Sequence, residues 1–89
     1  MVQNMKSSNG NSIPNQFIIF TPDATFFQSY NSVIVKITFI DGKRTIFLDE
    51  ATWDYSRTTT KYRNQFLRET TKETEKNIKS GKYTLTNLN

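Results

Sequence analysis

The fold is decided by residues 32 to 48, which read SVIVKITFIDGKRTIFL. Before Asp41-Gly42 the side chains alternate between two sides, and many residues are β-branched, which is typical of a strand. Because Asp-Gly suits a two-residue turn with positive φ at both positions, the stretch predicts a β-hairpin. The expected cross-strand pairs are Ile40 with Lys43, Ile37 with Ile46, and Val35 with Leu48. A shift of one residue would place Lys36 opposite the apolar Leu48, so the pattern favours this register.

The residues before this hairpin divide into a polar segment and two further strands. Residues 1–15 are rich in Asn, Ser and Gln and show no apolar periodicity, so we expect a disordered polar tail. Residues 16–21 contain an apolar run and predict a short strand that ends at Pro22. Residues 24–28 predict another strand, which turns through residues 29–32 and places Phe26 opposite Val35.

The residues after the hairpin predict two short helices and a closing strand. Tyr62 and Phe66 are four residues apart, and Thr58 or Thr59 could cap a helix that runs to about Glu69. Thr70 and Glu73 have the spacing of a capping box, and Gly81 is placed to end the second helix. Residues 82–88 alternate as a strand does. We therefore expect one α+β domain over residues 16–89: a small antiparallel meander of three to five strands, with two short C-terminal helices packed against it.

The composition removes the side chains that most catalytic and metal sites need. The chain has 89 residues with no histidine and no cysteine, so neither imidazole nor thiolate chemistry is present. No hydroxyl, lysine or carboxylate stands in a spacing that marks a nucleophile with its base. The expectation is a protein that is not an enzyme and that uses no cofactor and no metal. Two alternatives stay open: Mg²⁺ held by Asp49, Glu50 and Asp54, and an enzyme completed by dimerisation.

The apolar segments are too short to enter a membrane. No run approaches the roughly 20 apolar residues that a spanning helix requires. The first residues contain Ser, Asn and Gly where a signal peptide would be apolar. We therefore expect a cytoplasmic protein with no membrane partner.

The positive charge lies in the second half of the chain. The net charge is +4, and residues 51–89 carry eight Lys and Arg against four Asp and Glu. Lys72, Lys76 and Lys79 recur at helical spacing, and tyrosines are interleaved with the basic residues around Arg57. The alternative interpretation is a solvated helix face with an aromatic core beneath it. The candidate binding residues are Tyr55, Arg57, Lys61, Tyr62, Arg63, Arg68, Lys72, Lys76 and Lys79.

Three segments carry a resemblance to a known group of proteins. They are FQSYNSVI at residues 27–34, WDYSRTT at residues 53–59 and KYRNQFL at residues 61–67. Together they resemble a family of small uncharacterised proteins of phages, plasmids and other mobile elements of Gram-positive bacteria. The resemblance runs from about Thr25 to the C-terminus and leaves the first fifteen residues outside. It implies a genomic setting in which small proteins act by binding, including anti-CRISPR and other anti-defence proteins.

Two hypotheses of function follow. The first is a non-catalytic inhibitor or modulator that docks on a host protein or nucleoprotein complex that handles nucleic acid, inside the host cell. The second is an accessory or regulatory protein that binds DNA or RNA directly through its basic residues. A homodimer formed through an uncovered strand edge is a further expectation.

Overall fold

The predicted hairpin is present in the computed structural model, which describes residues 1–89. Strands β4 (Ser32–Ile40) and β5 (Lys43–Asp49) are antiparallel, and the three predicted pairs are all found. Asp41 and Gly42 have φ values of 52° and 78°, as a two-residue turn of this kind requires. The Asp-Gly turn therefore fixes the register, as predicted.

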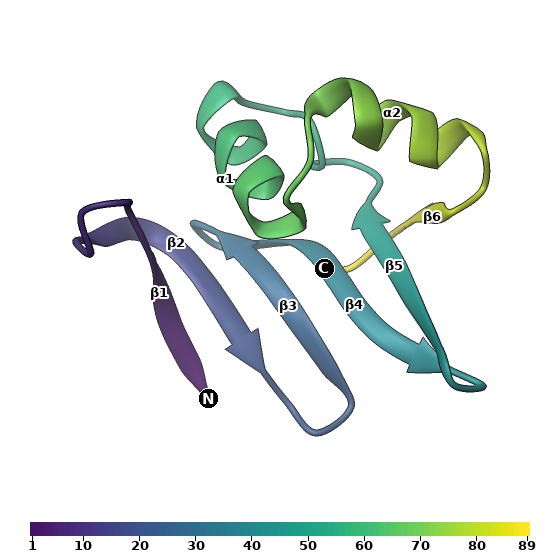
Figure 1. The fold of residues 1–89 in the computed structure, drawn as a ribbon, viewed down its shortest axis with the longest axis horizontal. Coiled ribbons are helices and arrows are strands. Elements are labelled where there is room, and N and C mark those ends of the chain that lie inside the picture. The colour runs from purple at the N-terminus through teal and green to yellow at the C-terminus, as the bar shows by residue number, and fades with distance from the viewer.

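The hairpin forms the fourth and fifth strands of a six-stranded sheet in the order β1-β2-β3-β4-β5-β6 (Figure 1). The other strands are β1 (Val2–Lys6), β2 (Ser12–Phe20), β3 (Ala24–Ser29) and β6 (Tyr83–Thr86). Neighbouring strands are antiparallel except β5 and β6, which are parallel. The α+β class is as predicted, and the sheet is larger than the expected three to five strands.

The extra strand comes from the first fifteen residues, so the prediction of a disordered tail there is wrong. Strand β1 pairs with β2, and residues 7–11 form the turn between them, closed by a 2.9 Å hydrogen bond from the Ser7 N–H to the Asn11 carbonyl. Met5 and Ile13 are buried in the core, while most of their neighbours are polar and exposed. Two apolar residues are enough to anchor this hairpin, but they are too few to give a visible periodicity.

Strand β3 also differs from the prediction in its register. Phe27, and not Phe26, lies opposite Val35, and the turn has only two residues, with Ser29 paired to Ser32. A bulge between Phe27 and Gln28 absorbs the difference. The core row across the sheet is therefore Ile18, Phe27, Val35 and Leu48.

The two helices are α1 (Arg57–Leu67) and α2 (Thr71–Lys79). Helix α1 begins two or three residues earlier than the predicted caps imply, because Ser56 caps it by accepting a hydrogen bond from the Thr59 N–H at 3.1 Å. The capping box of Thr70 and Glu73 is present, and Gly81 follows α2 with φ of 84°. Neither helix has the length and apolar composition of a membrane-spanning segment.

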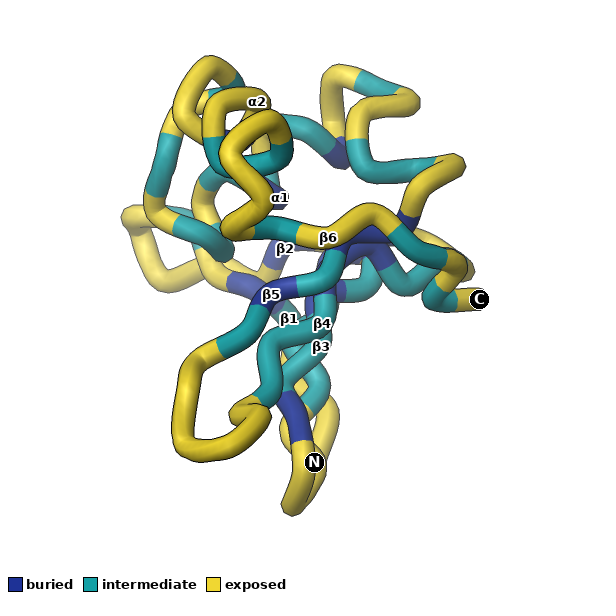
Figure 2. The backbone as a smooth tube through the Cα atoms, turned by 90° about the vertical axis from the view of Figure 1, so that its right-hand side faces the viewer, coloured by how far each residue is buried: buried dark blue, intermediate teal, exposed yellow.

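Both helices lie at one end of the sheet (Figure 1), on the face that carries Phe27. The Phe27 and Phe66 rings stack at 5.7 Å, and the Ser29 and Thr59 hydroxyls are hydrogen-bonded at 2.9 Å. Figure 2 shows that most buried residues gather where helices and sheet meet, whereas the far hairpin turns are exposed. The other half of this face therefore has no helix over it. Phe26 and Phe47 point to the opposite face and are partly exposed.

Candidate functional site

The start of α1 brings three of the predicted binding residues together. Tyr55, Arg57 and Lys61 line a shallow depression of about 750 Å³. Arg57 and Lys61 are one helical turn apart, so they share a face, and Tyr55 precedes the Ser56 cap with 50% of its surface exposed. The other lining residues are Asp54, Ser56, Thr60 and Asn64. The depression thus combines an exposed aromatic ring with charges of both signs.

The structure places Arg63 inside the protein, so its prediction as a surface binding residue is wrong. Its side chain is fully buried, with 0% exposure, and its guanidinium carbon lies 5.2 Å from the Trp53 ring centre. The guanidinium donates hydrogen bonds to the Trp53 carbonyl, to Asn64 Oδ1 at 2.8 Å and to Thr71 Oγ1 at 3.3 Å. Burial lowers the pKa of Arg63, and the nearby Asp54, Glu69 and Glu75 oppose that shift.

These contacts make Arg63 the link between three segments. The Trp53 carbonyl belongs to the loop before α1, Asn64 to α1 and Thr71 to the start of α2. Asn64 Nδ2 also donates to Thr71 Oγ1 at 3.0 Å. The loop that carries Tyr55 is therefore held against both helices by a buried cation.

Tyr62 is only partly available for binding. Its ring packs against the hydrophobic core, and Lys61 Nζ lies 5.3 Å from the centre of that ring. At this exposed position the contact is a weak cation–π interaction.

The lysines of α2 form a second exposed cluster of mixed charge. Lys72, Lys76 and Lys79 line a shallow hollow of about 420 Å³ together with Glu73 and Glu75. A third hollow, which includes Asp54, Glu75 and Lys79, connects this cluster with the depression at α1. Five cationic and three acidic side chains are therefore spread over one connected surface.

Arg68 does not belong to that surface. It is exposed at the opposite end of α1, where it caps the helix with φ of 58°. There it borders a separate groove of about 450 Å³ on the part of the sheet that no helix covers. The hydrophobic residues of this groove are Met5, Ile18, Phe20, Ile37, Phe39 and Phe66.

Phe20, Phe39 and Arg44 of this groove are not among the residues predicted from the sequence. The hairpin register did contain one signal, because it pairs Phe39 with Arg44 on the face of Val35 and Ile37. An α-helix rises only about 1.5 Å per residue, so the 11 residues of α1 reach roughly 16 Å and leave the far strand ends bare.

Asp49, one of the three acidic residues considered for a metal, has structural partners. Burial alone would raise the pKa of Asp49, but hydrogen bonds from the Thr52 hydroxyl and the Leu88 N–H hold it below its ordinary value. Both Asp49 carboxylate oxygens are used in this way. No group of three or more acidic side chains comes together in a geometry that could hold a metal ion.

Glu69 and Tyr83 form another structural contact. Glu69 accepts hydrogen bonds from the Thr74 and Tyr83 hydroxyls, so it connects the end of α1 with α2 and β6. Burial raises the pKa of Tyr83 to about 12, and the hydrogen bond to Glu69 adds to the shift. This pair fastens the C-terminal strand to the helices.

Comparison with known proteins identifies the family of the chain. A model of the family of unknown function DUF8033 matches residues 1–82, and the chain belongs to that family. The matched range includes the first fifteen residues, in keeping with their place in the sheet. No curated protein and no solved structure matches the chain.

Proposed function

We propose that this member of the DUF8033 family acts by binding and not by catalysis, as an inhibitor or modulator that docks on a host protein or nucleoprotein that handles nucleic acid. The proposed docking surface is the depression lined by Tyr55, Arg57 and Lys61, with its extension toward α2. We infer that it works inside the cytoplasm of a host cell, in the manner of an anti-CRISPR or other anti-defence protein.

The observation that carries this proposal is the mixed charge around an exposed tyrosine. Tyrosine and arginine are enriched at the energetic centres of protein interfaces, and Tyr55 and Arg57 lie together here. Asp54 adjoins them, and Glu73 and Glu75 lie among the lysines of α2. Alternating signs suit the complementary charges of a protein surface, whereas a phosphate backbone favours an uninterrupted positive track.

The rigidity of the surface supports the same conclusion. Arg63 and the Ser56 cap hold the loop of Tyr55 in place before any partner arrives. A surface that is already ordered loses less conformational entropy on binding. We also propose that the protein is encoded by a mobile element. The resemblance of residues 53–67 to proteins of phages, plasmids and other mobile elements supports this part of the proposal.

The test is a pull-down from a lysate of the host, with and without nuclease treatment. A protein partner that is retained after nuclease and lost with the Tyr55→Ala variant supports the proposal. Tyr30→Ala is the matched control, because Tyr30 is 48% exposed, close to the 50% of Tyr55, and lies in the β3–β4 turn. Equal loss in both variants, or capture of nucleic acid without any protein, would contradict the proposal.

Direct binding of nucleic acid is the second candidate, because Lys72, Lys76 and Lys79 lie together on the exposed face of α2. Contacts with three phosphates would give a steep dependence of affinity on salt. Replacing all three lysines by Gln should make the slope of log K against the logarithm of the salt concentration less steep by roughly 3. Titration with duplex and single-stranded DNA and RNA measures this, and a signal that no variant changes would reject the candidate.

A further inference from the structure

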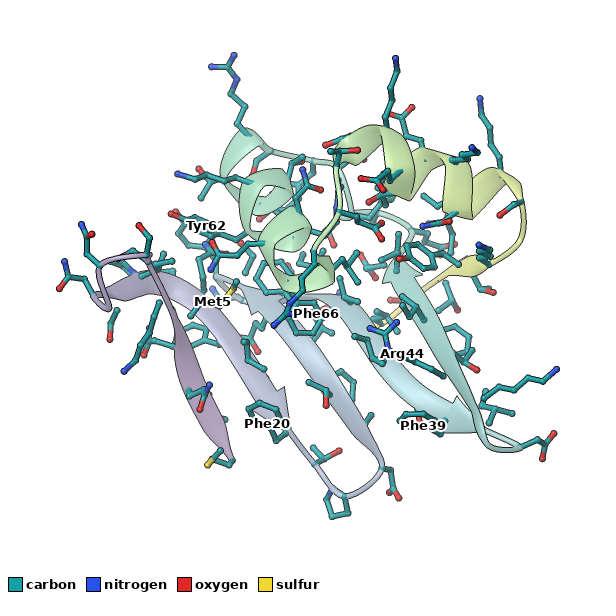
Figure 3. All side chains as sticks on the ribbon, in the orientation of Figure 1. Met5, Phe20, Phe39, Arg44, Tyr62 and Phe66 are labelled. Atoms are coloured by element: carbon teal, nitrogen blue, oxygen red, sulfur yellow. The ribbon has the colours of Figure 1, made fainter.

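The uncovered half of the sheet face carries a groove that the proposed function does not use. Residues of strands β1 to β5 form its floor, and the C-terminal end of α1 forms one wall (Figure 3). Phe20, Phe39 and Arg44 point onto this face from three strands, below Phe66 of the helix. The depression with Tyr55 lies at the other end of α1, so the two surfaces are separate.

The groove exposes large aromatic side chains on regular strands. Phe39 is 67% exposed and Phe20 is 39% exposed, although both lie on the face that holds the core. Ile18 and Ile37 lie between these two phenylalanines and the core, and both are partly exposed. Apolar surface that continues directly from a core onto an uncovered face is typical of an interaction site.

The charges of the groove are all of one sign. Arg44 lies opposite Phe39 in the β4–β5 pairing, and Arg68 stands on the helix wall. No Asp or Glu is among the ten residues that line the groove. An occupant of the groove therefore meets two guanidinium groups, which favour carboxylates by charge and by geometry.

We propose that this groove binds an acidic, amphipathic peptide segment of a partner protein. The groove has a floor and a single wall, so it could not enclose most of the surface of a small ligand, as small-molecule pockets do. Phe20 is in register with Ile37, so Phe39 lies two strands away and two residues further along, about 12 Å from Phe20. Apolar side chains seven or eight residues apart on a helix are separated by about 10.5–12 Å and would match them.

Two other occupants fit less well. A second copy of the chain would bring Arg44 and Arg68 close to their own equivalents, because a twofold interface places the same patch on both sides. A nucleic acid strand could stack bases on Phe20 and Phe39, but it would find only two cations in the groove to contact its phosphates.

The test selects peptides from a random 12-residue display library on the intact protein, after depletion on the Phe39→Ser, Arg44→Gln double variant. The enriched peptides are synthesised with a fluorescent label, and their dissociation constants are measured by anisotropy. Ile40→Ser and Lys43→Gln are the matched controls, because Ile40 and Lys43 form the adjacent cross-strand pair on the opposite face and Ile40 is 48% exposed.

The expected peptides combine Asp or Glu with aromatic or large aliphatic residues. Phe39→Ser and Arg44→Gln should each weaken binding at least tenfold, while Ile40→Ser and Lys43→Gln leave it within twofold. Phe39 is already largely in water, so its loss leaves the fold intact. No enrichment, enriched peptides without acids, or equal losses in both pairs would overturn the proposal. Binding of a labelled oligothymidine that depends on Phe39 and Arg44 and displaces the peptide would assign the groove to nucleic acid instead.

Discussion

Replacing Arg63 by Ala should remove about 4 kcal/mol from the free energy of unfolding. The guanidinium donates three hydrogen bonds from a fully buried position, and the Trp53 carbonyl and Asn64 Oδ1 would lose their donor. A buried acceptor that loses its donor costs about 1–3 kcal/mol, and the cavity left by the truncated side chain beside Trp53 adds to the loss. Proteins of this size unfold with about 5–13 kcal/mol, so the variant would be close to its folding limit.

Arg63→Met separates the loss of hydrogen bonds from the loss of packing volume. Methionine fills most of the volume but leaves the Trp53 carbonyl unpaired, so we expect a loss of about 2 kcal/mol. Arg57→Ala is the control, because Arg57 is exposed on the same helix, and its effect should stay within about 0.5 kcal/mol.

Urea unfolding followed by circular dichroism and by the fluorescence of Trp53, the one tryptophan, measures all three variants. If Arg63→Ala unfolds within about 1 kcal/mol of the wild type, the buried guanidinium does not hold the loop and the two helices together, and the reasoning is refuted.

The remaining predictions concern the cap of α2 and two titrating groups. Thr70→Ala removes the capping box and should lower the unfolding free energy by about 1 kcal/mol in the same urea assay, with Thr58→Ala as an exposed control in α1; equal effects would contradict the capping role. The raised pKa of Tyr83 stabilises the fold below the unfolded pKa near 10, and this contribution is lost as the pH rises toward 12. Thermal unfolding of Tyr83→Phe should therefore depend less on alkaline pH than that of the wild type, and parallel curves would show that the hydroxyl is not linked to folding. The lowered pKa of Asp49 stabilises the fold above the unfolded pKa near 4, and this contribution is lost as the pH falls below it. Asp49→Asn should flatten the acid side of the stability profile, and an unchanged acid transition would reject the assignment.

The features that local chemistry dictates could be predicted from the sequence. Asp41-Gly42 needs positive φ at both positions, and this requirement set the turn and three strand pairs. Thr70 and Glu73 satisfy each other within one helical turn, so their spacing was sufficient to place the start of α2. Both signals depend on residues that are close together in the chain.

The features that depend on tertiary packing could not be predicted in this way. Strand β1 is anchored by Met5, whose burial requires contacts with distant segments. Arg63 has the same sequence context as its exposed neighbours, and only the positions of Trp53 and Thr71 make it a buried donor. The separation of Arg68 from the lysines of α2 likewise depends on how α1 crosses the sheet. The groove around Phe39 becomes visible only when the length of α1 is compared with that of the strands beneath it.

Hydrogen exchange on the complex with the captured partner tests the proposed docking surface most directly. Exchange of the backbone amides of residues 54–64 should slow at least about tenfold on binding, because the partner covers Tyr55, Arg57 and Lys61. Unchanged exchange over residues 54–64, together with protection elsewhere in the chain, would show that the protein binds through a different surface.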